Sequence, residues 1–227
     1  MTNPLHTLDA HPLIWRANSD NGQHAHTRVA TGFSVFDESL KGGLPSKGVV
    51  RVRASLGIGE LSLFKRVFSS NHHNKLNVFI NPPGELQASW FALAGIDADK
   101  VYCLNNLADE DSLWATEQCL KESVCHCVVL WVTQITPKHA RRLQVAARQN
   151  DALCLILQSD TSPRVALPIC LDLTLTAADG GLSVHIEKQQ NNWSGPPVFQ
   201  PFRYTPDNTI INSLMAEGKA SHNAIAQ

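Results

Sequence analysis

The sequence predicts an α/β fold in which a mostly parallel β-sheet is flanked by helices. Short runs of consecutive apolar residues, typical of buried parallel strands, alternate with stretches whose apolar residues lie three or four positions apart, as in helices packed on a sheet. Two alternating segments, 171–177 and 182–188, are joined by a Gly-rich turn at 178–181. This last pattern predicts a C-terminal β-hairpin.

Length and composition indicate one folded domain with extensions. The chain has 227 residues, of which 43% are hydrophobic and 17% charged, and its formal net charge is -1. We expect a mobile N-terminal arm over residues 1–28, a core domain over 29–206 and a polar C-terminal tail over 207–227. Because the net charge is close to zero, contact with nucleic acid would need a local basic patch.

The cysteines predict a reducing, cytoplasmic compartment. They lie in apolar segments without a C-x-x-C pair, at positions 103, 119, 125, 127, 154 and 170. No basic region followed by an apolar run opens the chain, and no eighteen consecutive apolar residues occur in it. We therefore expect a protein that is neither secreted nor membrane-spanning.

Cys125-His126-Cys127 places two thiols on one face of an expected strand, which raises the question of a zinc site. No second pair of ligands has metal-site spacing elsewhere in the sequence. We expect no metal, and we interpret these cysteines as small buried hydrophobic residues.

The stretch 49–68 has the strand, glycine turn and helix order of a phosphate-binding P-loop. A working loop has the pattern G-x-x-x-x-G-K-[ST], in which the Lys neutralises phosphate and the hydroxyl reaches Mg²⁺. When Gly59 is placed on the second glycine, Ala54 falls on the first, Glu60 on the lysine and Leu61 on the hydroxyl residue. Each of these replacements acts against nucleotide binding.

Glu60 brings a carboxylate to the place where phosphate charge must be compensated. A like-charge contact at short range costs about 1 to 4 kcal/mol in a surface-like dielectric. We expect Glu60 instead to serve as the carboxylate that is favourable at a helix N-terminus. The alternative is an ordinary strand-to-helix turn without nucleotide ancestry.

The rest of the core continues the alternation of strands and helices. We expect strands at 77–80, 101–104, 127–132 and 152–157, and helices at 85–94, 109–123 and 136–150. In the helix at 85–94, the residues Leu86, Trp90 and Leu93 mark the apolar face, and Gly95 suits its C-terminal cap.

The order of motifs resembles that of RecA-like recombinases. Thr31-Gly32-Phe33 with Asp37 precedes Gly42-Gly43-Leu44-Pro45, and the strand and P-loop turn follow. In RecA-like ATPases the strand corresponding to 77–80 ends near the glutamate that activates water, and the strand at 127–132 carries the Walker B carboxylate. The resemblance therefore implies a degenerate nucleotide site in which Pro83 stands at the first position and Trp131 or Val132 at the second.

Within this group the chain is most similar to the ImuA proteins, which are associated with translesion DNA synthesis. The motifs that carry the resemblance are His11-Pro12-x-x-Trp15-Arg16, Thr31-Gly32-Phe33, Gly42-Gly43-Leu44-Pro45, Gly57-Ile58-Gly59-Glu60-Leu61, Pro82-Pro83, Ser112-Leu113-Trp114-Ala115-x-Glu117-Gln118 and Trp131. The chain departs from the family in its long polar N-terminal arm and extended C-terminal tail.

The resemblance implies a non-catalytic RecA-like protein of the SOS response that needs no cofactor. Its partners would be an ImuB-type protein, an error-prone DNA polymerase and RecA, and its contact with DNA would be indirect. ImuA proteins are also related to the SulA cell-division inhibitors, so the alternative is an inhibitor that binds FtsZ. A third alternative is a residual ATPase or nucleotide sensor.

Two features are candidate partner contacts. Trp15 lies in an apolar island of the N-terminal arm, where it either docks on a partner or packs on its own domain. The helix at 136–150 has a basic surface formed by Lys138, Arg141, Arg142 and Arg148. This surface is either a contact patch for DNA or an acidic partner, or a solvated helix face.

Overall fold

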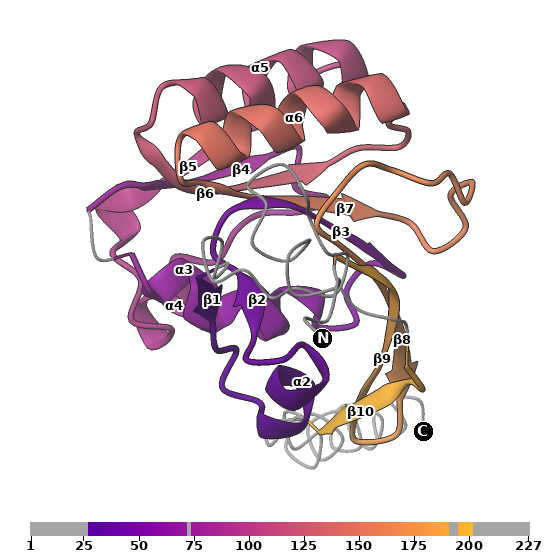
Figure 1. Ribbon diagram of the computed structural model, residues 1–227. Helices are drawn as coiled ribbons and strands as arrows, with labels where there is room; N and C mark the ends of the chain where they lie inside the picture. Colours follow the sequence, from indigo (N-terminus) through magenta and orange to yellow (C-terminus); the bar gives the residue numbers. More distant parts are fainter. Residues whose placement is uncertain (1–26, 72–73, 191–194, 202–227) are drawn as a thin grey trace, which may run out of the picture.

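The fold is built on one eight-stranded sheet. The computed structural model describes residues 27–71, 74–190 and 195–201, and the strand order is β10-β9-β8-β3-β7-β6-β4-β5 (Figure 1). Its strands are β3 (Gly48–Ala54), β4 (Leu76–Ile80), β5 (Val101–Leu104), β6 (Cys125–Trp131), β7 (Leu153–Gln158), β8 (Leu171–Ala178), β9 (Gly181–Gln189) and β10 (Val198–Pro201). A separate small sheet pairs β1 (Arg28–Val29) with β2 (Leu44–Pro45).

The strands from β8 to β5 are parallel, and only β9 and β10 run antiparallel to their neighbours. The predicted α/β class and mostly parallel sheet are therefore confirmed. The predicted hairpin is β8–β9, in which Ala178 pairs with Gly181. Its two-residue turn includes Gly180, whose φ of +72° lies in the left-handed region that glycine adopts without strain.

Helices cover both faces of the sheet (Figure 1). They are α2 (Ser34–Ser39), α3 (Lys65–Ser69), α4 (Ala88–Leu93), α5 (Asp109–Lys121) and α6 (Pro137–Gln149), with 3₁₀ turns η1 (Glu60–Phe64) and η2 (Ala98–Lys100). Helices α5 and α6 lie together on one face, and α3 and α4 lie on the other.

The alternation of side chains along β6 divides the core into two layers. Cys127, Val129 and Trp131 pack in the cluster on the α3–α4 face, whereas Val128 and Leu130 pack in the cluster on the α5–α6 face. Because both faces are covered, the strand reads as one continuous apolar run in the sequence.

The segment after β4 corrects one detail of the sequence prediction. The helix begins at Ala88 rather than at residue 85, so it has only six residues. Leu86 and Trp90 pack against the core as expected, but Leu93, expected on the apolar face, is 83% exposed. Gly95 follows the helix with φ of +69°, as expected of a C-terminal glycine.

The helix expected after β3 is divided in two. It starts as the 3₁₀ turn η1, after Gly59 in the left-handed conformation with φ of +91°, and continues as the short α3. Within the described residues, no helix has the length and apolar character needed to cross a membrane. The predicted arm at 1–28 is described only from Thr27, and Trp15 and the tail at 207–227 lie outside the described residues.

Candidate functional site

The seven positions of the predicted degenerate nucleotide site lie at or after the carboxyl ends of three strands. Strands β3, β4 and β6 belong to the parallel part of one sheet, so these ends meet at one edge. In open α/β sheets, ligands bind in the crevice outside this edge. Glu60, Pro83 and Trp131 therefore all lie at or beyond this edge of the sheet.

The loop between β3 and η1 depends on two glycines. Ala54 ends β3 as a buried residue paired with Leu175 of β8. Gly57 and Gly59 follow with φ of +81° and +91°, a region that side chains rarely adopt. A Cβ added to Gly57 would meet nothing within 4 Å, so the backbone conformation, not crowding, favours glycine there.

The two positions after Gly59 turn inward. Glu60 is the first residue of η1 and is only 8% exposed, and Leu61 is half-buried and packs against the core on the α3–α4 face. The residue expected at the lysine position of a P-loop is thus a buried carboxylate, and the residue expected at the hydroxyl position is an apolar side chain. Neither group compensates phosphate charge or reaches a metal ion.

Pro83 is exposed in the loop after β4. This loop is held by Asn81, whose side-chain amide donates to the Leu107 carbonyl at 2.7 Å and whose oxygen accepts from the Leu107 amide at 2.9 Å. An open pocket of about 370 Å³ lies here and is also lined by Glu85. That carboxylate comes two residues after the position of the catalytic glutamate in the RecA-like pattern, and sequence reasoning did not single it out.

Trp131 points into the core rather than toward a ligand. Its ring stacks on Phe79, with centroids 6.3 Å apart and planes 30° apart. Phe79 also contacts Phe68 at 5.6 Å and Phe91 at 5.4 Å between ring centroids. Trp131, which was expected at the Walker B position, is therefore part of an aromatic cluster, and its indole Nε1 has no hydrogen-bond partner among the described residues.

Two buried arginines of β3 were not recognised as ion-pair partners from the sequence. Arg51 donates from Nε and Nη2 to the two carboxylate oxygens of Asp172, at 2.9 and 2.5 Å. Arg53 donates from Nη2 to Glu187 at 3.2 Å and to Thr174 at 3.0 Å. These contacts join β3 to the β8–β9 hairpin beside the candidate site.

The carboxylate of Glu187 accepts hydrogen bonds from several side chains. Burial raises the pKa of its carboxyl, but hydrogen bonds from Thr174 and His185, together with the charges of His185 and Arg164, outweigh burial and leave the pKa below its ordinary value. The lowered pKa favours the ionised form of Glu187, in which it forms ion pairs with Arg53 and Arg164.

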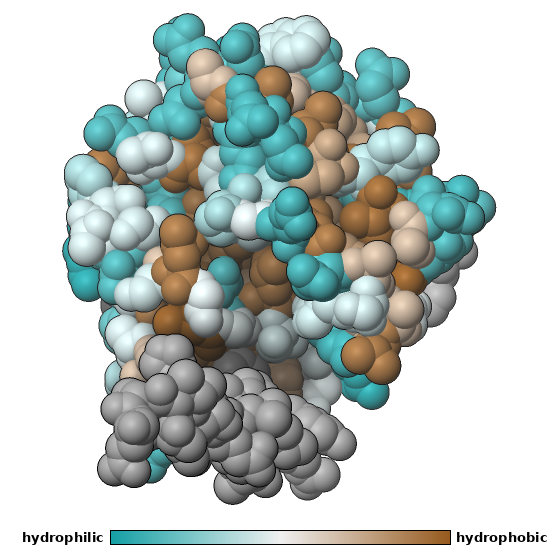
Figure 2. All heavy atoms as spheres, turned by 180° about the vertical axis from the view of Figure 1, so that it is seen from behind, coloured by the Kyte–Doolittle hydropathy of each residue, from teal (hydrophilic) through white to brown (hydrophobic). Residues whose placement is uncertain are grey.

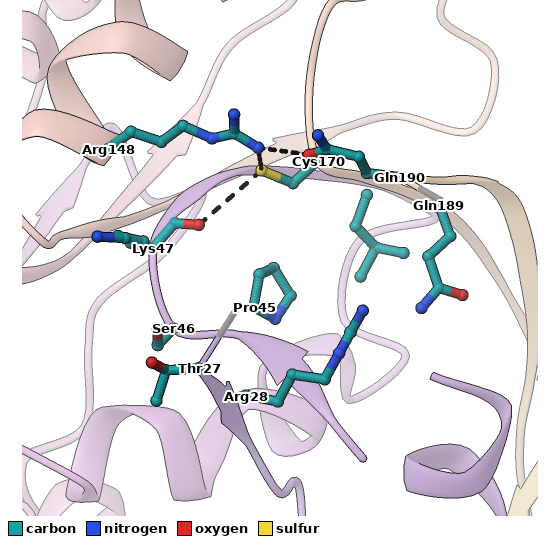
Figure 3. Close-up of a pocket in the computed structure, with 10 residues that line it drawn as sticks. Thr27, Arg28, Pro45, Ser46, Lys47, Arg148, Cys170, Gln189 and Gln190 are labelled. Atoms are coloured by element: carbon teal, nitrogen blue, oxygen red, sulfur yellow. Dashed lines mark hydrogen bonds between the residues drawn. The ribbon is translucent and has the colours of Figure 1, made fainter. Parts of the chain in front are cut away.

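The four predicted basic contacts do not form one patch. Lys138, Arg141 and Arg142 are exposed on α6, whereas Arg148 is half-buried. Figure 3 shows Arg148 directed toward Cys170 and Gln190; its Nη2 lies 3.4 Å from the Cys170 sulfur and also donates to the Gln190 side chain. The cavity in that view is about 30 Å³, too small for a ligand much larger than water.

Arg142 is partly neutralised by the neighbouring helix. Its Nη2 lies 2.5 Å from Glu117 of α5, and Lys121 lies 2.7 Å from the same carboxylate. Burial raises the pKa of Glu117, but the hydrogen bonds from Lys121 and Arg142 outweigh it and hold the pKa below its ordinary value. Lys138 and Arg141 form no ion pair with any described residue.

No metal-binding group is present in the described part of the chain, where no three His, Cys, Asp or Glu side chains come together in a suitable arrangement. Cys125 and Cys127 are buried, and the His126 Nε2 lies 2.7 Å from the Val67 carbonyl oxygen. Burial raises the pKa of the Cys127 thiol well above its ordinary value, which disfavours the thiolate that binds zinc.

No protein-family model matches the chain. One curated protein, the cell division inhibitor SulA of Photorhabdus laumondii, is 27% identical over 81 residues. The chain is weakly related to SulA. The match covers 36% of this chain and 46% of that protein, so the chain spans less than half the length of its relative.

A solved structure of SulA from Pseudomonas aeruginosa is similar to 48% of this chain and 97% of its own, with 20% sequence identity and a TM-score of 0.40. This likeness is too distant to extend the sequence relationship.

Proposed function

We propose that this chain is a non-catalytic, RecA-like adaptor of the SOS response that supports translesion DNA synthesis. It would bind an ImuB-type polymerase-like partner and an error-prone DNA polymerase, with RecA as a further partner. The observation that carries the proposal is the nature of three side chains at the carboxyl edge of the sheet, Glu60, Pro83 and Trp131.

Each of these side chains opposes one part of ATP hydrolysis. Glu60 repels phosphate, Pro83 has no group that accepts a proton from water, and Trp131 is an apolar ring where a carboxylate would hold Mg²⁺. A RecA-like core without these reagents retains surfaces for binding. The ImuA-like motifs then favour partners that act in damage tolerance.

An affinity pull-down tests this proposal. The tagged protein is recovered from DNA-damaged cells of its own source, and the captured proteins are identified by mass spectrometry, with the tag alone as control. Recovery of polymerase subunits, with or without RecA, supports the adaptor. Recovery of FtsZ without any polymerase subunit refutes it.

The second candidate function is a SulA-like inhibitor that binds FtsZ and delays division. The observation that favours it is the 81-residue match to a protein named as a cell division inhibitor. Light scattering of purified FtsZ tests it directly. The inhibitor predicts that this protein suppresses FtsZ polymerisation in proportion to its concentration, whereas unchanged polymerisation at an excess of the protein counts against it.

A further inference from the structure

Helices α5 and α6 lie side by side on one face of the sheet (Figure 1), and the residues between them line a groove. Two adjoining pockets of about 280 and 370 Å³ form this groove and share Glu117 and Arg142. We call it the α5–α6 groove and define it by Trp114, Lys121, Lys138, Arg141, Arg142 and Val145.

Each pocket contains an exposed apolar side chain. Trp114 lines the first pocket and is 63% exposed, and Val145 lines the second and is 46% exposed. The α5–α6 layer lies at the top of Figure 2, where hydrophilic side chains predominate and hydrophobic ones lie between them. Exposed tryptophans set among polar side chains are frequent anchors of protein interfaces.

The second pocket is positively charged. Lys121, Lys138, Arg141 and Arg142 line it, and Glu117 is the one carboxylate among its lining residues. Glu117 is already bound by Arg142 and Lys121, and Lys138 and Arg141 have no ion pair with a described residue. An acidic partner would compensate this charge and would be attracted to this part of the surface.

The chemistry of the groove favours a polypeptide over nucleic acid. Glu110 lines the first pocket and Asp109 and Asp111 flank it at the start of α5, so a phosphate backbone that followed the groove would meet like charge. A polypeptide can place carboxylates over the basic pocket and an apolar side chain against Trp114.

We propose that the α5–α6 groove binds an acidic segment of a partner protein, with its carboxylates on Lys138 and Arg141 and an apolar anchor against Trp114. The inference rests on the proposed function only in that binding is taken as the role of the protein. It assigns Trp114 and Val145 to the contact surface and leaves Arg148 outside it.

Fluorescence anisotropy with synthetic peptides tests the groove. The probe is a short labelled peptide rich in glutamate with a central pair of leucines, and the same peptide with lysines in place of the glutamates is the comparison. We expect only the acidic peptide to bind, with an affinity that falls as salt is added. Lys138→Glu combined with Arg141→Glu, and separately Trp114→Ala, should each weaken binding by about tenfold or more.

Matched substitutions on other surfaces serve as controls. Lys41→Glu with Lys65→Glu makes the same change in charge away from α5 and α6, and Leu93→Ala removes an even more exposed apolar side chain on α4. These variants should bind the acidic peptide within about twofold of the unaltered protein. Circular dichroism of every variant verifies that the fold is retained.

Three outcomes would refute the proposal that the α5–α6 groove binds an acidic segment. They are no binding of the acidic peptide to the unaltered protein, equal weakening by the control variants, and tighter binding of a labelled single-stranded oligodeoxynucleotide that is lost in the same groove variants. The peptide assay and the pull-down fail independently. A pull-down without polymerase subunits refutes the proposed function, whereas these three outcomes refute the proposed peptide binding at the groove.

Discussion

Arg51 and Asp172 form a buried, two-hydrogen-bond ion pair between the central strand β3 and its neighbour β8. Both side chains are nearly inaccessible to water, so each charge depends on the other for compensation. The pair fixes the position of the hairpin against the strand that leads into the glycine loop. It therefore links the architecture of the sheet to the geometry of the candidate site.

Replacing Asp172 with Ala should strongly destabilise the fold, because it leaves the Arg51 guanidinium buried without a counter-charge. Loss of one partner of a buried pair costs about 3 to 5 kcal/mol of unfolding free energy. Urea unfolding monitored by circular dichroism measures it. The control is Lys47→Ala, which breaks the exposed Lys47–Asp151 pair and should cost at most about 1 kcal/mol. Equal losses in the two variants would contradict this account of the pair.

Replacing Glu60 with Lys should not create an ATPase. The new lysine restores one element of a P-loop, but Leu61, Pro83 and Trp131 still lack the groups that hold Mg²⁺ and activate water. Release of inorganic phosphate from ATP should remain at the level of a protein-free blank. Turnover by this single variant would refute the interpretation of the site, and tight ATP binding by the unaltered protein would restore the nucleotide-sensor alternative.

Trp131 should respond to substitution as a core residue. Trp131→Phe keeps an aromatic ring against Phe79 and should unfold at a slightly lower urea concentration. Trp131→Asp introduces the residue type of a Walker B motif. It also places a charge among buried aromatic rings and removes a large side chain. We expect a loss of about 3 to 5 kcal/mol or failure to fold. A folded Trp131→Asp protein of near-normal stability would show that this position is not structural.

Glu117 makes the stability of the protein depend on pH. Its pKa in the folded protein is lowered, so its contribution to stability is complete above the pKa of the unfolded chain, about 4.3, and is lost as pH falls through the folded value. Unfolding experiments from pH 7 downward should show a loss of stability below about pH 5. Glu117→Gln should reduce this loss, and an identical pH profile for the variant would contradict the assignment.

Cys119 should be the most reactive thiol near neutral pH. A hydrogen bond with Cys125 outweighs burial and lowers the pKa of Cys119 to about 7, whereas desolvation raises the pKa of the exposed Cys103. Alkylation by iodoacetamide, followed residue by residue with mass spectrometry, should rise at Cys119 with a midpoint near its pKa. Cys125→Ala should move that midpoint to higher pH. Faster alkylation of Cys103 at pH 7 would contradict the expected order.

Consecutive apolar residues located the parallel strands well. The expected strand at 127–132 is β6 (Cys125–Trp131), and the expected strand at 77–80 is β4 (Leu76–Ile80). A strand that is covered on both faces carries apolar residues at nearly every position, so it appears in the sequence as a short continuous apolar run. The hairpin was also predictable, because its alternation and its glycine turn are both local features.

Ion pairs between residues far apart in the chain could not be predicted from the periodicity of the sequence. Arg51 and Arg53 alternate with valines, a pattern that does not distinguish an exposed strand face from a buried one that carries ion pairs. Their burial depends on Asp172 and Glu187, which are 121 and 134 positions away along the chain. The contacts of Arg148, which was expected on the basic surface, could not be predicted for the same reason, because its partners Cys170 and Gln190 belong to other segments.

The predicted nucleotide site was likewise visible in the sequence only in part. The residue types at 60, 61, 83 and 131 follow from the sequence alone, and they already oppose hydrolysis. The core packing of Trp131 against Phe79 emerges only when several elements are brought together, whereas Glu85 follows Pro83 by two residues and was visible in the sequence.

The central claim is that this protein serves damage tolerance through binding, and one experiment on its own host cells tests it most directly. Cells that lack the protein are exposed to DNA damage, and the frequency of induced mutations and the cell length are measured in the same culture. The adaptor predicts that induced mutations fall while damaged cells still elongate. Unchanged mutation frequency with loss of elongation would contradict the adaptor and assign the protein to control of cell division.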